Sequence, residues 1–201
     1  MDKSTDQKTT EQNQSLPGKT VAASRVRLSQ FMNIDLANPQ GNVHGGSIMK
    51  LVDEAGALAA MRHARSLVVT VAMDSMTFME PIYVGNLVTL DAELTYVGNT
   101  SMEARVEVVA ENPLTGKHSR TNTAYLVYVA IDTQGHPQPV PPLIAETDEE
   151  HAQMEAARER QVYRKQQRQR DKASWQQRQT TQMAQVTQAP PAADRAESHH
   201  A

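Results

Sequence analysis

The residues with the clearest chemical potential are a glycine-containing segment and one aspartate that follows it. The segment Asn-Pro-Gln-Gly-Asn-Val-His-Gly-Gly-Ser occupies positions 38–47 and leads into an apolar stretch that carries Asp53. The start of a helix presents unpaired backbone N–H groups and the positive end of the helix dipole, which suit an oxyanion or a polarised carbonyl. The pattern therefore indicates a carboxylate about two helical turns from an anion-stabilising helix start.

The apolar stretch after the segment predicts a helix that is buried on most sides. Ser47 is its predicted N-cap. A carboxylate in such surroundings is costly unless it is used or paired, which makes Asp53 a functional candidate. The alternative stays open that Asp53 or Glu54 lies at an exposed edge or forms an ion pair with Lys50, Arg62 or Arg65. The apolar residues that surround the helix axis are Ile48, Met49, Leu51, Val52, Ala55, Leu58, Ala59 and Met61.

The remaining pattern predicts an α+β fold in which an antiparallel sheet wraps around this central helix. One strand is expected before the helix and four in antiparallel succession after it, because alternating apolar and polar residues mark half-buried strands. The turns at Gly98-Asn99 and at positions 112–116 are too short for parallel crossovers. A single helix inside a curled sheet needs no further layer. The predicted strands cover residues 21–32, 68–79, 88–96, 102–110 and 121–131.

Several ordered motifs carry a family resemblance. They include Leu51–Gly56 in the helix, Phe78–Ile82 and Gly98–Glu103, together with Arg62-His63, Val69-Thr70 and Pro137–Pro142. With the segment at 38–47, these motifs resemble the hotdog-fold acyl-CoA thioesterases of the brain acyl-CoA hydrolase type over roughly residues 20–170. The acidic run 144–150 and the charged helix predicted after it resemble the C-terminal extension of that group.

The resemblance implies hydrolysis of a fatty acyl-CoA to the free acid and coenzyme A. It also implies a homodimer in which an asparagine before the helix of one protomer meets an aspartate in the helix of the other. Those positions are Asn38 and Asp53 here, so a homodimer carries two complete sites. Two-domain animal relatives divide the pair between tandem domains, whereas this chain has one such domain and needs oligomerisation. Three dimers are expected to form a hexamer.

Thioester hydrolysis needs an activated water or a nucleophile, and a group that stabilises the carbonyl oxygen. Asp53 can act as general base or attack directly to give a mixed anhydride, and Asn38 can hold the water or the carbonyl. The candidate oxyanion and substrate-binding positions are Gly45, Gly46 and Ser47, with the N–H groups of the last two as the first choice. No metal or cofactor is expected, since coenzyme A enters only as part of substrate and product.

The phosphates of coenzyme A require polar or basic contacts. Many members of the family that the chain resembles have arginine or lysine in the turn where this chain has Asn99 or Thr100. The usual phosphate contact is therefore not expected at this turn. The candidates for coenzyme A binding are Arg62, Arg65, Thr70, Ser101 and Lys117, with His118 and Arg120 nearby in sequence.

Other reaction classes find less support. Ser47 does not lie in a Gly-x-Ser-x-Gly motif, so we interpret it as a helix cap and not as a nucleophile. The chain has neither cysteine nor a His-Glu-x-x-His motif, which gives no support to a catalytic thiol or a zinc site. A hotdog hydratase or dehydratase that uses His44 for proton transfer is one alternative. A non-catalytic acyl-CoA sensor or scaffold is the other. A preference for medium to long acyl chains is expected from the apolar residues Met49, Val52, Met61, Val71, Met73 and Met76.

Composition indicates one domain with polar ends. A net charge of −3 gives no general attraction to nucleic acid, and no apolar stretch is long enough for a membrane span. Residues 1–19 are unlike a signal or transit peptide, so a cytoplasmic location is expected. The predicted organisation is a disordered tail over 1–19, the thioesterase domain over 20–143, a charged helical extension over 144–173 and a disordered tail over 174–201.

Overall fold

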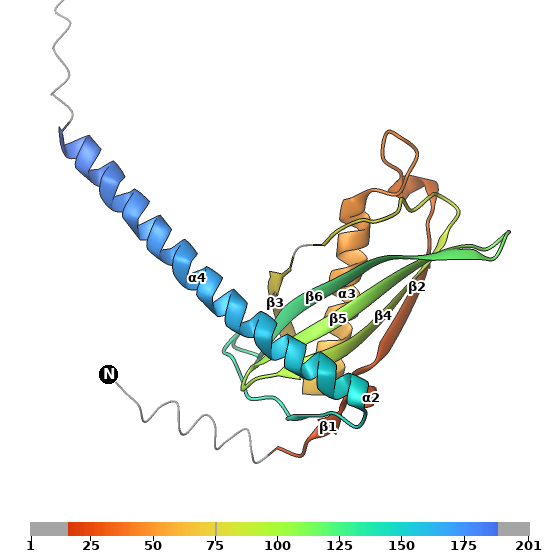
Figure 1. Cartoon of the computed structure of the whole chain (residues 1–201), viewed down its shortest axis with the longest axis horizontal. Coiled ribbons are helices and arrows are strands. Elements are labelled where there is room, and N and C mark those ends of the chain that lie inside the picture. Colours follow the sequence, from red (N-terminus) through yellow and green to blue (C-terminus); the bar gives the residue numbers. More distant parts are fainter. Residues whose placement is uncertain (1–15, 75, 189–201) are drawn as a thin grey trace, which may run out of the picture. The chain divides into compact units, whose positions relative to one another are not determined.

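A five-stranded antiparallel sheet curls around one long helix in the computed structural model, which describes residues 16–74 and 76–188 (Figure 1). The central helix, α3, spans Gly45–Ala64. The strands lie in the order β2-β4-β5-β6-β3 and every neighbouring pair is antiparallel. This confirms the predicted α+β class. The strands are β2 Val26–Phe31, β3 Leu67–Met73, β4 Leu87–Val97, β5 Ser101–Asn112 and β6 Lys117–Ile131.

Two of the predicted strands differ from the structure. The strand predicted over 68–79 ends at Met73, and the one predicted over 21–32 begins as the short helix α2, Val21–Ser24, before β2 starts. The predicted succession of four neighbouring strands is also wrong, because β3 pairs with β6 and not with β4. The long connection over 74–86 leads from β3 to β4. Strand β3 therefore forms an edge of the sheet.

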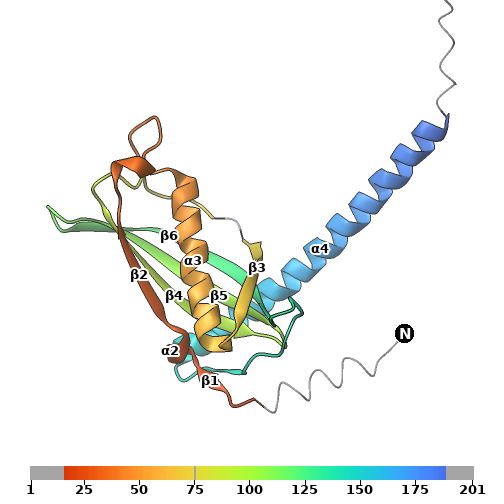
Figure 2. The ribbon, with the colours of Figure 1, turned by 180° about the vertical axis from the view of Figure 1, so that it is seen from behind.

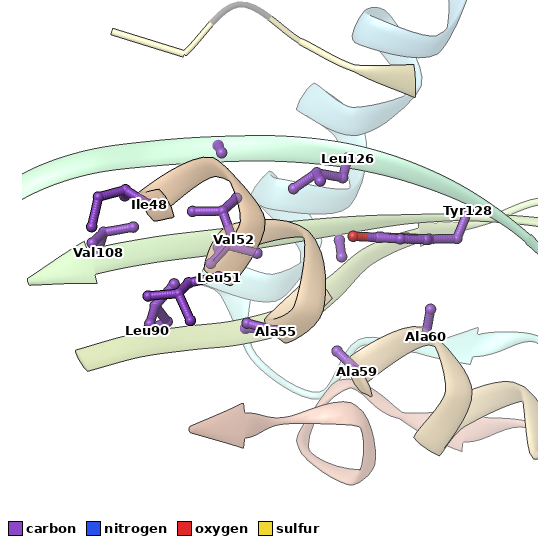
Figure 3. Packing of buried hydrophobic residues seen from close by; sticks show 14 of the residues in the cluster. Ile48, Leu51, Val52, Ala55, Ala59, Ala60, Leu90, Val108, Leu126 and Tyr128 are labelled. Carbon is purple, nitrogen blue, oxygen red and sulfur yellow. The ribbon is translucent and has the colours of Figure 1, made fainter. Parts of the chain in front are cut away.

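The hydrophobic core lies between α3 and the concave face of the sheet (Figure 3). Alternate residues of the central strands point inward, which is the pattern that the sequence predicted for β4 and β5. Alanines on the buried side of α3 allow the helix to approach the strands closely. The labelled core side chains in Figure 3 are Ile48, Leu51, Val52, Ala55, Ala59, Ala60, Leu90, Val108, Leu126 and Tyr128.

The expectation that α3 is buried on most sides is wrong for a single chain. Met49 and Leu58, which lie about half a turn apart around the helix axis, flank its uncovered side with 41% and 40% of their surface exposed. The reason is geometric, because one curled sheet covers only one side of a helix. The uncovered side between Met49 and Leu58 carries the exposed ion pair of Lys50 and Glu54.

The ends of the domain differ in part from the predicted boundaries. Strand β1, Lys19–Thr20, pairs in parallel with β7, Leu143–Ile144, so Lys19 belongs to the ordered domain. Helix α4 spans Asp148–Gln188 and continues through much of the predicted tail over 174–201, because glutamine, arginine and alanine favour helices. Residues 1–15 and 189–201 lie outside the described residues. A 3-10 turn, η1, spans Ile34–Leu36.

The chain consists of two compact units, and the boundary between them lies between Arg158 and Glu159. The first unit includes the start of α4, where Ala157 is fully buried. In the second unit, Val162 and Tyr163 are exposed, in keeping with the mostly polar sequence there. Among the described residues, no helix combines the length and the apolar character that crossing a bilayer requires.

A buried histidine ties the end of α3 to the segment that precedes β7. His63 is fully buried, and its Nε2 lies 2.8 Å from the carbonyl oxygen of Pro141. Because a carbonyl only accepts, Nε2 must carry the proton, which leaves Nδ1 as a buried lone pair without a hydrogen-bond partner in the described part of the chain. Burial lowers the pKa of His63, and the nearby positive charge of Lys19 lowers it further.

The buried histidine predicts a pH dependence of stability. Unfolded His63 has the ordinary pKa near 6.5, whereas its pKa in the folded protein is lower. The free energy of unfolding is therefore unaffected by this group above about pH 6.5 and decreases as the pH falls below that value, because the unfolded state binds more protons. The slope from one proton is at most about 1.4 kcal/mol per pH unit. Denaturant titrations from pH 8 to 5 should show a smaller loss for His63→Gln than for wild type. The exposed His136→Gln is the control, and equal slopes in all three proteins would contradict this account.

Candidate active site

Asn38 lies at the start of a tight loop that leads into α3. Its Oδ1 accepts hydrogen bonds from the backbone N–H groups of Gln40, at 2.9 Å, and Asn42, at 3.1 Å. Gly41 has a φ of 82°, a left-handed conformation that favours glycine at this turn. Since the amide oxygen serves the loop, the amide nitrogen is the part of Asn38 that can donate to a bound molecule.

The N-cap of α3 is His44 and not Ser47 as the sequence predicted. The Nδ1 of His44 accepts from the N–H of Gly46 at 3.0 Å, and the His44 carbonyl accepts from the N–H of Ser47 at 2.9 Å. Both predicted oxyanion donors, Gly46 and Ser47, are therefore already occupied. Gly45 is left as the first N–H group of the helix, and no described residue accepts from it. His44 serves as a helix cap, a structural role that suits the His-Gly-Gly sequence.

A cavity of about 310 Å³ opens beside this helix start. Asn38, Asn42 and Gly45 are among the residues that line it. Its walls are largely apolar. None of the six apolar residues that the sequence analysis expected to contact the acyl chain lines this cavity, and one of them, Val52, belongs to the hydrophobic core instead. The loop that follows β3 supplies most of the far wall. The lining residues are Asn38, Asn42, Val43, Gly45, Ile48, Phe78, Met79, Glu80, Pro81 and Ile82.

Asp53 lies in the middle of α3, half-buried and facing two strands. Thr70 on β3 donates its hydroxyl to Oδ1 of Asp53 at 2.8 Å. Tyr128 on β6 shares its single hydroxyl proton between the Asp53 carbonyl oxygen, at 3.0 Å, and Oδ1, at 3.2 Å. Thr70 and Tyr128 are direct partners in the β3–β6 register, and a β-bulge follows Thr70. The sheet thus aims two hydroxyl groups at one carboxylate oxygen.

The alternative that the acidic residues of α3 form ion pairs holds for Glu54 but not, among the described residues, for Asp53. Glu54 pairs with Lys50 at 2.6 Å on the exposed side of the helix. The hydrogen-bond partners of Asp53 are Thr70 and Tyr128, and no described basic residue forms an ion pair with it. No described residue donates to Oδ2 of Asp53, which leaves this oxygen available for chemistry.

Asn38 and Asp53 do not meet within one chain. Asp53 is eight residues beyond Gly45, which places it about 12 Å further along the helix axis. It is not among the residues that line the 310 Å³ cavity. Within one chain the two residues therefore do not line a common cavity.

The predicted coenzyme A contacts are spread over the molecule. Arg62 donates to the Arg25 carbonyl at 2.8 Å, and Arg65 ends α3 in a left-handed conformation with a φ of 58°. The Thr70 hydroxyl is directed to Asp53. Ser101 and Lys117 lie at opposite ends of the β5–β6 hairpin, about 35 Å apart at the usual rise per residue. The five residues therefore do not form one phosphate site within a chain.

Tyr128 is the residue at this site that the sequence analysis missed. It lies in a strand whose alternating pattern marks it only as a core residue. The available signal was Gly56, since a glycine inside a helix costs about 0.5–1 kcal/mol relative to alanine and calls for a packing reason. Gly56 faces the Tyr128 hydroxyl.

The sequence of this chain is similar to those of known acyl-CoA thioester hydrolases. The profile of the thioesterase superfamily matches residues 40–117. An acyl-CoA thioester hydrolase of Bacillus subtilis is 38% identical over 125 residues, which are 62% of this chain and 72% of the relative. The cytosolic acyl coenzyme A thioester hydrolase of Mus musculus is 35% identical over 151 residues, covering 72% of this chain. The chain spans only 40% of the length of that mouse protein.

Solved structures agree in fold. An acyl-CoA hydrolase from Staphylococcus aureus, in complex with butyryl coenzyme A, coenzyme A and coenzyme A disulfide, has a TM-score of 0.74 and 31% identity, covering 80% of this chain and 98% of its own. An apo-hexameric acyl-CoA thioesterase has a TM-score of 0.73 and 36% identity, covering 76% and 97%. Variants of the S. aureus hydrolase replace an asparagine, an aspartate 15 residues later and a threonine 17 residues after that by alanine.

Proposed function

The chain belongs to the acyl-CoA thioester hydrolases of the thioesterase superfamily and has their hotdog fold, and from this membership we propose that Asp53 of one chain and Asn38 of its partner together hydrolyse the substrate. The observation that carries the proposal is the setting of Asp53. Its Oδ1 is anchored by two hydroxyl groups, while its Oδ2 is open to a reacting molecule.

The proposed reaction breaks the carbon–sulfur bond of the thioester. With Asp53 as general base, Oδ2 takes a proton from water as the water oxygen attacks the carbonyl carbon. The thiolate of coenzyme A then leaves and is protonated, and the acyl group is released as the free acid. With Asp53 as nucleophile, Oδ2 attacks the same carbon and water hydrolyses the resulting mixed anhydride. Coenzyme A is part of substrate and product, and the proposal uses no metal.

The spacing of residues in a relative supports this choice of side chains. The asparagine, aspartate and threonine replaced in the S. aureus variants have the same spacing as Asn38, Asp53 and Thr70 here. In this chain, Thr70 directly contacts Asp53. The third residue of the set thus has a physical role as an anchor of the carboxylate.

The thioester carbonyl is proposed to bind at the start of α3. The N–H of Gly45 lies at the positive end of the helix dipole, and Asn38, whose amide nitrogen is a donor, lines the same cavity. Both can donate to the oxygen on which charge develops during attack. The partner chain must then bring its Asp53 to this carbonyl.

A homodimer through the β3 edge is proposed as the assembly that does this. Strand β3 ends the sheet and exposes Leu67, Val69 and Val71. An unpaired apolar edge favours pairing with another chain, and a two-fold axis would place the two β3 strands side by side. Met49, which lies one helical turn before Asp53 on the side of α3 that contacts β3, extends the apolar surface onto the helix. Since one of the solved relatives is described as hexameric, we propose that three dimers form a hexamer.

Medium to long fatty acyl-CoAs are the proposed substrates, and a cytoplasmic location is proposed because a mammalian relative is described as cytosolic. A thiol-release assay over acyl-CoAs from two to sixteen carbons tests the substrate proposal. We expect kcat/KM to rise with chain length, by roughly a factor of four for each methylene that becomes buried, until the apolar wall is filled. A maximum at acetyl-CoA without turnover of longer chains would overturn the substrate class but leave thioester hydrolysis intact.

A further inference from the structure

The Tyr128 hydroxyl reaches from the sheet to α3 at the level of the Asp53 carboxylate. Tyr128 is fully buried, and Figure 3 shows its ring extending from β6 with the hydroxyl oxygen directed at the helix. The hydroxyl contacts both the backbone carbonyl and the Oδ1 of Asp53. One atom therefore links the helix backbone to the carboxylate and restricts the rotation of the Asp53 side chain.

Thr70 alone cannot fix the carboxylate in this way. It is an exposed residue at the sheet edge and makes one hydrogen bond to Oδ1. The Tyr128 hydroxyl approaches the same oxygen from the neighbouring strand. Two donors on different strands fix the orientation of the carboxylate more tightly than one donor does.

Gly56 provides the space that the Tyr128 hydroxyl occupies. It lies three residues after Asp53 and therefore on the same side of the helix. A Cβ atom at Gly56 would lie 2.5 Å from the Tyr128 hydroxyl oxygen and 3.1 Å from two carbons of the ring. The ring is fully buried, so it cannot move aside without disturbing the core. Only glycine at position 56 is compatible with this hydroxyl.

We propose that Tyr128 is a positioning residue that orients the Asp53 carboxylate for attack, and that Gly56 is required because any side chain there displaces the Tyr128 hydroxyl. The inference rests on the proposed role of Asp53. The hydroxyl stays neutral and keeps donating at working pH, because burial and then the charge of Asp53 raise the pKa of Tyr128 above its usual value.

The test compares Tyr128→Phe with wild type and with Tyr125→Phe, which removes a hydroxyl from the outward-facing side of the same strand. With one acyl-CoA substrate, Tyr128→Phe should lower kcat by about 10- to 100-fold, the scale of a misplaced catalytic group, with KM changed by less than about threefold. Tyr125→Phe should retain kcat. An unchanged kcat in Tyr128→Phe, or a rise in KM alone, would overturn the proposal.

Two further measurements separate a positioning role from a structural one. Gly56→Ala should lower both kcat and the melting temperature, and its effect on the melting temperature should be smaller in a Tyr128→Phe background, where the closest atom is gone. Equal effects in both backgrounds would overturn the role given to Gly56.

The second measurement adds Tyr128→Phe to Asp53→Asn, which should cause little further loss because Tyr128 acts through Asp53. An additive loss in this double variant would overturn the positioning role. If Asp53→Asn itself retains wild-type activity, the proposed function fails. If it is inactive and Tyr128→Phe is not impaired, only the present inference fails.

Discussion

Replacing Asp53 by asparagine should lower kcat for acyl-CoA hydrolysis by a factor of about 10² to 10⁴, because the side chain can no longer accept a proton or attack the thioester. Asparagine has nearly the same shape and retains an oxygen that accepts from Thr70 and Tyr128. Removal of a partly buried charge need not harm the fold. The assembly and the melting temperature should therefore stay close to those of wild type. Thiol release and thermal unfolding of the same preparation measure both.

Glu54 provides a matched control for this substitution. It neighbours Asp53 on the same helix but pairs with Lys50 on the exposed side. Glu54→Gln should therefore retain most of the wild-type turnover. Near-wild-type turnover in Asp53→Asn would instead mean that the carboxylate is structural, and the proposed mechanism would be wrong.

Mixing two inactive variants should restore activity. If each site takes Asn38 from one chain and Asp53 from its partner, a dimer of one Asn38→Ala chain and one Asp53→Asn chain has one intact site and one doubly substituted site. Random exchange makes about half of the dimers mixed, so the ceiling is roughly a quarter of the wild-type sites if sites act independently. The measurement is turnover after subunit exchange, with the mixed dimers quantified by differently tagged chains.

The second role of Asn38 in its loop calls for an additional variant. Its Oδ1 accepts from Gln40 and Asn42, so Asn38→Ala also loosens the loop. Asn38→Asp keeps an acceptor for these bonds and removes the amide donor, and it should be similarly inactive alone and similarly rescued. Exchanged mixtures that contain mixed dimers but remain as inactive as the separate variants would show that each site is built within one chain.

Local sequence pattern predicted most of the secondary structure. Alternation over 88–96 and 102–110 identified β4 and β5, because a sheet with one covered face requires period two. The apolar stretch after the glycines identified α3. The cap was misplaced because His44 uses a ring nitrogen as the acceptor, a choice less common than the serine that follows it.

Contacts between distant segments escaped prediction. Strand β3 was identified, but its place beside β6 depends on where the long connection over 74–86 leads the chain. The same placement brings Thr70 opposite Tyr128 and directs both hydroxyls to Asp53. Nothing in the spacing of these three residues along the chain marks them as neighbours.

The sequence by itself determined the fold class, the central helix and the two side chains, Asn38 and Asp53, on which the proposed chemistry depends. The fold class and the helix follow from local period, which is a property of short segments, whereas the pairing of Asn38 with Asp53 follows from the family resemblance of the motifs. Only the tertiary structure decided which N–H group remains open at the helix start, which hydroxyls hold Asp53, and that Asn38 and Asp53 are separated within one chain. The physical reason is that hydrogen-bond partners and cavities depend on distances between strands and helix, which packing sets after the local elements have formed.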